Sequence, residues 1–354
     1  MKVAIVALPF LPIPPTRYGG TEQIVAHVVQ GLLELGHEPI LLAPGDSKVN
    51  CRLVPICQNS IPFPKTKAEK VDHDQQIAIA TQNTKDELNK LIEQKEIDII
   101  HSHGFDLLEF QHFPNVTTLH GPIDLDNRDY FLARKELGFI SISENQQHTC
   151  PELNYIDVVY NGLDTDQFTF VEQPEDYVCF LGRFDRQKNP HLAIQLALQY
   201  GIKIKLGGKV DFVGHDYFAE EIEPHLNNPL VEYLGELNFE QKVKLVGNAK
   251  CNLHPTGFRE PFGLSIVEAA YCGTPTLAIT KGSMSELIEN ERTGSMVEDF
   301  AEGYNYLDKC FEMNREYIST RAKMLFNYKT MCQGYLRAYE KAITKYNDSV
   351  LLNN

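Results

Sequence analysis

The residues best suited to chemistry in this sequence gather in one segment, His254–Pro275, which reads HPTGFREPFGLSIVEAAYCGTP. The segment leaves an apolar run and opens a helix, with Pro261 and Gly263 at the helix entrance. Because the first N–H groups of a helix have no partner inside it, those of Phe262, Gly263 and Leu264 are expected to point outward, unpaired. A helix N-terminus of this kind favours anions, and a diphosphate fits it.

Two carboxylates accompany this expected anion site. Glu260 lies just before the helix and Glu268 lies about one and a half turns inside it. Carboxylates beside a phosphate are costly unless they accept hydrogen bonds from hydroxyl groups, such as those of a sugar and a ribose. Two glutamates at this spacing are more often a solvated helix face, so their role depends on the rest of the chain.

The elements that must position these residues follow an alternating pattern. Short apolar runs alternate with helix-like segments, which is typical of parallel sheets with crossover helices. A polar, proline-bearing stretch at 161–176 reads as a linker, so the pattern predicts two doubly wound α/β lobes, with ligands at the carboxyl ends of the strands. The expected strands are Lys2–Leu8, Pro39–Ala43, Ile97–His101, Val116–His120, Phe139–Ser143 and Asp157–Tyr160 in the first lobe, and Tyr177–Gly182, Ile202–Leu206, Val231–Leu234, Cys251–His254 and Thr276–Ile279 in the second.

Helices are expected between these strands. Thr21 is a candidate cap for a first helix that ends near Gly36, and the second lobe contains helical patterns at Pro190–Tyr200 and Phe239–Asn248. The tail from about Glu312 to Tyr346 is also helical in pattern.

Length and composition narrow the class of protein. A chain of 354 residues is long for one hydrophobic core, so two lobes are the natural expectation. The net charge of −15 argues against nucleic-acid binding but leaves room for a small nucleotide. The eight cysteines form no CxxC pair, no stretch is apolar enough to span a membrane, and no cleavable leader is visible, so we expect a cytoplasmic protein with reduced thiols.

Four motifs in order resemble the retaining GT-B glycosyltransferases of family 4. The sequence Glu260-Pro-Phe-Gly-Leu with Glu268 matches the family signature E-P-F-G-L-x-x-x-E, and it is followed by A-x-x-C-G-T-P. Gly19-Gly20 is similar to the glycine-rich loop of the family, Asn161-Gly-Leu-Asp to its N-G-V-D element, and the stretch from Gly182 to Asn189 to its G-R-x-x-x-x-K-G/N. The resemblance covers nearly the whole chain.

The resemblance implies roles residue by residue. Arg183 and Lys188 would neutralise the charge that grows on a departing diphosphate, Glu260 would hold hydroxyls of the donor sugar, and Glu268 would hold the ribose. His120 matches a histidine that family members place beside the donor sugar. The implied donor-binding set is completed by Gly19, Gly20, Asn161, Phe262, Gly263 and Leu264.

Other readings of the sequence are weaker. Asp164 and Asp166 form a D-x-D pattern that binds a metal in another glycosyltransferase class, but they lie in the linker, and the family that the chain resembles needs no metal. His101 and His103 could ligate zinc, but a third ligand is missing nearby, and we interpret them as cleft lining. The glycine motifs of dinucleotide-dependent oxidoreductases and P-loop NTPases are absent from the sequence.

The resulting expectation is a GT-B protein with two Rossmann-like, doubly wound lobes that face each other across a cleft. Residues 1–165, completed by a C-terminal helix at 331–354, would form the acceptor side, and residues 166–330 the nucleotide-sugar side. The enzyme would transfer a hexosyl group from a nucleoside-diphosphate sugar to a small-molecule or glycan hydroxyl, with retention and without a metal or other cofactor. A UDP-sugar is the favoured donor, and GDP-mannose is the alternative. Two alternatives remain open, a GT-B nucleotide-sugar epimerase and a non-catalytic nucleotide-sugar binder.

The surface charge of the first lobe bears on its partners. The first 165 residues hold 13 Lys and Arg against 22 Asp and Glu, which leaves a net charge of −9. Anionic membranes repel such a lobe, so the sequence gives no support to peripheral membrane contact and favours a soluble or glycan acceptor.

Overall fold

The computed structural model describes residues 1–16, 19–64, 66–210 and 214–352, and these form two compact units. Unit 1 comprises residues 1–163 together with 328–354, and unit 2 comprises residues 164–327. The expected lobe boundaries, after residues 165 and 330, lie within a few residues of these. The chain thus passes from one unit to the other twice.

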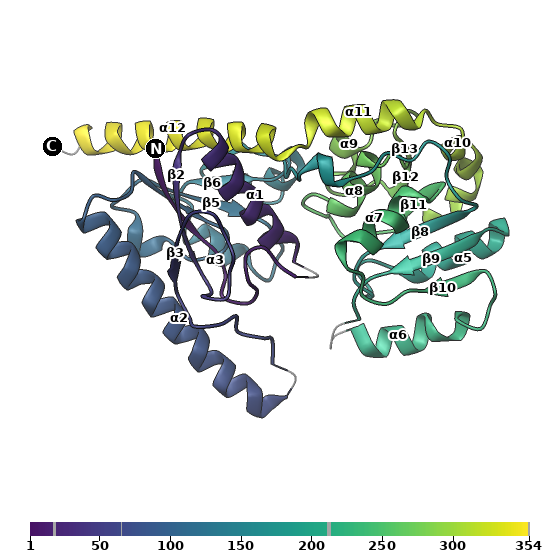
Figure 1. Cartoon of the computed structure of the whole chain (residues 1–354), viewed down its shortest axis with the longest axis horizontal. Helices are drawn as coiled ribbons and strands as arrows, with labels where there is room; N and C mark the ends of the chain where they lie inside the picture. Colours follow the sequence, from purple (N-terminus) through teal and green to yellow (C-terminus); the bar gives the residue numbers. More distant parts are fainter. Residues whose placement is uncertain (17–18, 65, 211–213, 353–354) are drawn as a thin grey trace. The chain divides into compact units, whose positions relative to one another are not determined.

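Unit 1 contains a seven-stranded parallel sheet in the order β3-β2-β1-β4-β5-β6-β7 (Figure 1). Every strand pair in this sheet is parallel, as expected of a doubly wound lobe. Its elements are β1 (Lys2–Val6), α1 (Gly20–Glu34), β2 (Glu38–Ala43), β3 (Arg52–Pro55), α2 (Lys67–Glu93), β4 (Ile99–Ser102), η1 (Leu108–Phe110), β5 (Asn115–Leu119), α3 (Arg128–Leu132), β6 (Phe139–Ser141), α4 (Glu144–Gln147), β7 (Tyr155–Val158) and α12 (Tyr328–Leu352).

Helices cover both faces of this sheet. Leu88 and Leu91 of α2 belong to one hydrophobic cluster with Ala4 and Val6 of β1, so α2 covers that face. Successive side chains of a strand point to opposite faces, and His101 of β4 contacts α12 on the other one. Helices α1 and α12 pack against each other there, and α12 also contacts β5 and β7. The C-terminal helix is therefore part of the core of unit 1.

Unit 2 contains a six-stranded parallel sheet in the order β10-β9-β8-β11-β12-β13. Its core joins buried side chains of β8, β9, β11 and β12 to those of α5 and α10. Its elements are η2 (Thr165–Gln167), β8 (Tyr177–Leu181), α5 (Pro190–Tyr200), β9 (Lys203–Gly207), α6 (His215–Glu221), η4 (Glu223–His225), β10 (Val231–Tyr233), α7 (Phe239–Gly247), β11 (Cys251–His254), α8 (Leu264–Tyr271), β12 (Thr276–Ile279), α9 (Met284–Leu287), β13 (Gly294–Val297), η5 (Phe300–Tyr306), α10 (Leu307–Phe311) and α11 (Arg315–Leu325).

The structure corrects the expected start of the first helix. Helix α1 begins at Gly20 with Gly19 as its N-cap, and no side chain caps it, so Thr21 lies inside the helix. The other end follows the expectation, because Gly36 adopts a φ of +78° after the last turn.

The eight cysteines are free thiols, and none of the described helices is long and apolar enough to cross a membrane.

Candidate active site

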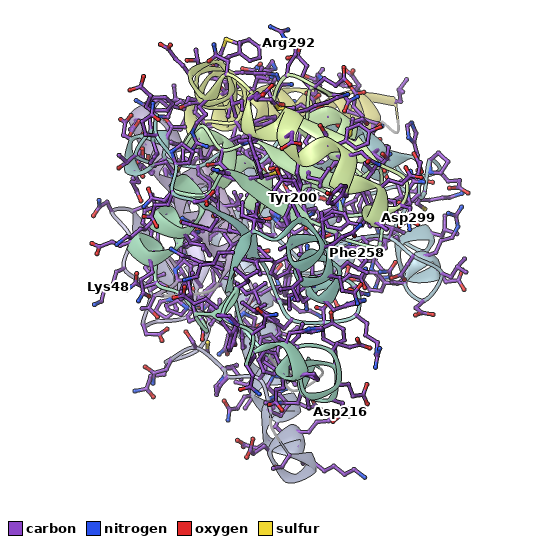
Figure 2. All side chains as sticks on the ribbon, turned by 90° about the vertical axis from the view of Figure 1, so that its right-hand side faces the viewer. Lys48, Tyr200, Asp216, Phe258, Arg292 and Asp299 are labelled. Carbon is purple, nitrogen blue, oxygen red and sulfur yellow. The ribbon has the colours of Figure 1, made fainter. Side chains whose placement is uncertain are left out.

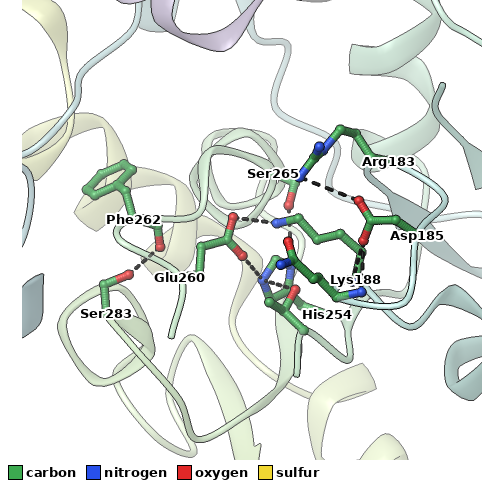
Figure 3. Close-up of polar contacts among 10 residues, drawn as sticks. Arg183, Asp185, Lys188, His254, Glu260, Phe262, Ser265 and Ser283 are labelled. Atoms are coloured by element: carbon green, nitrogen blue, oxygen red, sulfur yellow. Dashed lines mark hydrogen bonds and ion pairs between the residues drawn. The ribbon is translucent and has the colours of Figure 1, made fainter. Parts of the chain in front are cut away.

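The loops after β8 and β11 bring three of the expected site residues together. These strands are neighbours in the parallel sheet of unit 2, so their carboxyl ends lie at the same edge. The loop after β8 carries Arg183 and Lys188, and the loop after β11 carries Glu260 (Figure 3). Residues separated by about 70 positions in the sequence therefore meet at one point of the unit.

Lys188, Glu260 and His254 form a partly enclosed charge cluster at this point. Lys188 Nζ lies 2.5 Å from Glu260 Oε1, and His254 Nε2 lies 2.8 Å from Glu260 Oε2. The side chains of Lys188 and Glu260 are each 14% exposed and that of His254 only 4%. Burial alone would raise the pKa of Glu260, but the positive charge of Lys188 and the contact with His254 outweigh it and hold that pKa well below its usual range. Glu260 is thus a fixed carboxylate.

The loop after β8 is built to hold its two cations. Asp185 accepts hydrogen bonds from the backbone N–H groups of Gln187 and Lys188, each at 2.9 Å, and its other oxygen lies 3.4 Å from Arg183 Nη2. The ring of Phe258, labelled in Figure 2, lies 5.3 Å from the ammonium group of Lys188. One carboxylate therefore orders the turn and orients Arg183.

Helix α8 begins at this site with an uncapped N-terminus. Its N-cap is Gly263, with a φ of +126°, and no side chain caps the helix. Leu264 is its first residue, and the ring of Phe262 is buried against Phe326 at a centroid distance of 5.9 Å. Only the backbone of Phe262 could therefore contribute to an anion site.

A second loop braces the segment between Glu260 and Phe262. The N–H of Ser283 donates to the carbonyl of Glu260 at 3.1 Å, and its hydroxyl donates to the carbonyl of Phe262. Gly282 makes this approach possible: it has a φ of +64°, and a Cβ there would lie 2.3 Å from the carbonyl oxygen of Glu260. The orientation of Glu260 thus depends on residues that the sequence analysis did not select.

Glu268 is held by a partner that the sequence analysis also missed. Lys242 of α7 places its Nζ 2.5 Å from Glu268 Oε1, and the side chains are 19% and 6% exposed. Helix α7 is fixed at its start by a capping box of Asn238 and Gln241. No sequence motif marks Lys242, because it contacts Glu268 from a different helix.

The remaining expected residues lie in unit 1, each after the carboxyl end of a strand of its sheet. Gly19 and Gly20 follow β1 and start α1, where a Cβ on Gly19 would lie 2.7 Å from the side chain of Pro15. His120 directly follows β5, and Asn161 follows β7. Asn161 is 3% exposed, and its Oδ1 is buried without a hydrogen-bond partner in the described structure.

The interpretation of His101 and His103 as cleft lining is wrong, because His101 is 0% exposed and His103 only 1%. His101 is fully buried, with its two ring nitrogens 2.7 Å from the hydroxyl of Tyr339 and 2.8 Å from that of Thr118. Burial lowers the pKa of His101 to about 3. Among the described residues no group of three or more His, Cys, Asp or Glu side chains could hold a metal ion.

The first aspartate of the D-x-D pattern caps a short helix in the structure. Asp164 accepts hydrogen bonds from the backbone N–H of Asp166 and from the side chain of Gln167, and so caps η2.

Comparison with known proteins identifies the class. The family model described as glycosyl transferases group 1 matches residues 164–322, and the one described as glycosyltransferase family 4 matches residues 18–167. Together they span residues 18–322, and the chain belongs to the family 4-like glycosyltransferases of the GT-B fold. It is therefore a glycosyltransferase.

Individual relatives are distant. An uncharacterized glycosyltransferase of Methanocaldococcus jannaschii is 22% identical over 84% of this chain and 85% of its own. A D-inositol 3-phosphate glycosyltransferase of Mycobacteroides abscessus is 27% identical over 54% of this chain and 47% of its own, and a glycogen synthase of Mycobacterium tuberculosis is 24% identical over 56% and 55%. The aligned part covers about half the length of the last two.

Solved structures share the fold over the whole chain. The sucrose-phosphate synthase of Thermosynechococcus elongatus superimposes with a TM-score of 0.78 at 18% identity, covering 97% of this chain and 99% of the other. A glycosyltransferase involved in avilamycin A biosynthesis gives 0.72 at 20% identity, covering 97% and 98%. Anabaena HepE in complex with UDP and glucose gives 0.72 at 18% identity, covering 96% and 99%.

Proposed function

We propose that this glycosyltransferase moves a hexosyl group from a nucleoside-diphosphate sugar to a hydroxyl acceptor, with retention of configuration and without a metal. A UDP-sugar is the favoured donor and GDP-mannose the second choice. The acceptor is a small molecule or a glycan. Anabaena HepE, with the same fold, has been crystallised with UDP and with UDP-glucose, which supports uridine as the base to test first.

One observation carries this proposal: Lys188 is fixed 2.5 Å from Glu260, in the same loop as Arg183, and next to the uncapped N-terminus of α8. Cations held in place before reaction stabilise charge that develops in the transition state without reorganisation at that moment. The charge that develops when a sugar leaves a diphosphate lies on the phosphate oxygens. Lys188 and Arg183 would meet this charge, and the first N–H groups of α8 would add a partial positive charge.

The carboxylates would act on neutral parts of the donor. Glu260 stays ionised, so it can accept hydrogen bonds from sugar hydroxyls but cannot supply a proton. A diphosphate leaving group needs no proton, which fits this assignment. Glu268 has one oxygen on Lys242, and its carboxylate would also accept from the ribose.

Retention in this proposal follows from attack on the face of the leaving group. The acceptor oxygen bonds to the anomeric carbon as the bond to the diphosphate breaks, and the departing phosphate oxygen takes the acceptor's proton. No side chain serves as a nucleophile. A stable covalent glycosyl-enzyme isolated from the wild-type protein would contradict this step.

The test is a thermal-shift panel with UDP, GDP and ADP, each with and without EDTA. A ligand at 100 times its dissociation constant stabilises the folded state by about 2.7 kcal/mol, which is measurable. We expect the largest shift with UDP and no effect of EDTA. A shift that EDTA abolishes would refute metal independence, and no shift with any nucleotide would remove the donor site from the proposal.

Product analysis distinguishes a glycosyltransferase from an epimerase or a binding protein. The nucleotide-sugar that carries the base selected by the panel is incubated with an acceptor library, and the anomeric configuration of the product is read by NMR. A retained product supports the proposal. An epimerised sugar formed without acceptor, or tight binding without any product, would replace it with an epimerase or with a binding protein.

A further inference from the structure

Two histidine contacts repeat across strands β4 and β5. His101 contacts Thr118, and His103 contacts His120; each pair is separated by 17 positions in the sequence. Because strand side chains alternate between faces, His101 and His103 lie on the same face, and their rings are in contact, tilted by 43° with centroids 4.1 Å apart. His103 is therefore a side chain between the core and His120.

The ring of His103 is enclosed by other rings. It is 1% exposed and lies between the ring of His101 and that of His120, with the ring of Tyr335 edge-on at 6.4 Å. His101 is itself fixed by Tyr339 of α12. This packing fixes the position of His103 Nδ1, which lies 2.8 Å from His120 Nε2.

The contact between two ring nitrogens contains one proton. Burial lowers the pKa of His120 to about 4 and holds that of His103 well below its usual range, so both rings are neutral at pH 7. Either His103 Nδ1–H donates to His120 Nε2, or His120 Nε2–H donates to His103 Nδ1. The first arrangement puts the remaining proton of His120 on its Nδ1, and the second leaves that nitrogen bare.

The other nitrogen of His103 distinguishes the two arrangements. His103 Nε2 is buried and has no hydrogen-bond partner in the described structure. When His103 Nδ1–H donates to His120, His103 Nε2 carries only a lone pair. When His120 donates instead, His103 Nε2 carries the proton and is a buried N–H donor. Orphaned buried N–H donors are the rarer case in proteins, so the first arrangement is favoured.

We propose that His103 is a positioning residue that holds His120 as its Nδ1–H tautomer, so that the outer nitrogen of His120 is a hydrogen-bond donor for an oxygen of a sugar substrate. The hydrogen bond to the sugar rests on the proposed function. The assignment of the tautomer does not, because it follows from the contacts of His103 and His120 alone. Helix α12 and His101 would thus affect the reaction only indirectly, because they hold His103, and His103 sets the tautomer of His120.

The tautomer is measured by NMR on the whole protein with ¹⁵N-labelled histidine, with the His120 signals assigned by their loss in His120→Gln. We expect His120 to carry its proton on Nδ1, and to lose this preference in His103→Phe. Wild-type His120 protonated on Nε2 would overturn the proposal. The measurement needs no activity, so it stands even if the proposed transfer reaction fails.

Three substitutions of His103 then separate positioning from packing. Asn can place its amide nitrogen near the former Nδ1, Gln places it near the former Nε2, and Phe keeps only the ring. We expect His103→Asn to retain kcat within about 3-fold and the other two to lose about 10- to 100-fold, as typical for the outer partner of a functional histidine. The exposed His112→Gln serves as the control and should behave as wild type.

Affinity and folding are followed in parallel for each variant. The dissociation constant for UDP should stay within about 3-fold, because His103 contacts His120, which is expected to meet the sugar and not the nucleotide. Equal losses in the Asn and Gln variants, or wild-type kcat in His103→Phe, would overturn the proposal. If a variant is too unstable for kinetic measurement, the NMR experiment on the wild-type protein still tests the proposal, because it reports directly which nitrogen of His120 carries the proton.

Discussion

Lys188→Met is the sharpest perturbation of the charge cluster in unit 2. Methionine keeps most of the length and packing of the lysine stem but removes its charge. Glu260, whose side chain is 14% exposed, would then retain only its contact with His254 at 2.8 Å. Removing one partner of a buried pair costs about 3–5 kcal/mol. Because His254 remains, we expect the lower end, about 3 kcal/mol, or about 6–12 °C in the Tm of a unit of this size.

The pH dependence of this loss is a second signature. The folded-state pKa of Glu260 is depressed below its ordinary value of 4.5, so the pair stabilises the protein fully above that pH and progressively less below it. The difference in unfolding free energy between wild type and Lys188→Met should therefore be constant from pH 6 to 8 and shrink towards pH 3. Denaturant titrations at several pH values measure it.

Activity gives the third signature. The kcat should fall about 10²- to 10³-fold, while the affinity for UDP changes far less, because the charge that Lys188 meets develops in the transition state. Lys309→Met is the matched control, since Lys309 is 58% exposed and pairs with Glu291 at 3.4 Å; it should change stability by less than about 0.5 kcal/mol. An unchanged kcat in Lys188→Met, or a stability loss independent of pH, would refute the reasoning.

Three further perturbations test other parts of the structure. Glu268→Ala should weaken UDP binding by about 10- to 100-fold in a calorimetric titration, with Lys242→Met weakening it in the same direction; unchanged affinity in both would exclude a ribose contact. His101 alone should lower the unfolding free energy of unit 1 by about 2 kcal/mol from pH 7 to pH 5, because its folded-state pKa is depressed to about 3 and the unfolded chain takes up the proton first. His103 and His120 add to the same slope, and His101→Gln should remove only the part that belongs to His101. Gly282→Ala should lower both Tm and kcat, because its methyl group would displace the backbone of Glu260, and a wild-type kcat would show that this bracing is dispensable.

Much of the fold follows from local patterns. Strands β11 and β12 and helix α5 have the predicted bounds, because two of them are short, fully buried runs and the third begins with Pro190 and ends before Gly201. Strand β13 was missed, since Gly294-Ser295-Met-Val has little β propensity on its own. Helix α2 was missed because its long, mostly polar sequence buries only a few side chains.

The candidate site likewise contains residues that sequence motifs predict and residues that only the folded structure reveals. Arg183, Lys188 and Glu260 were selected because they belong to motifs, and the structure brings them together. Lys242 was not selected, because an ion pair between helices leaves no periodic signal in the sequence. The misreading of His101 has a similar cause: a buried histidine and one that faces a ligand look alike on a strand, and only the hydroxyl of Tyr339, 238 positions away, tells them apart.

The return of α12 to unit 1 has a consequence for synthesis on the ribosome. Domains generally fold as they emerge, the N-terminal one first. Here unit 2 is complete once Asn327 has emerged, while unit 1 still lacks the helix whose buried Tyr335 and Tyr339 cover its sheet. The first 163 residues must therefore stay unfinished, with the part of the sheet face that α12 covers still exposed, while the unit that follows them folds. The lobe that is made first is the last to reach its native state.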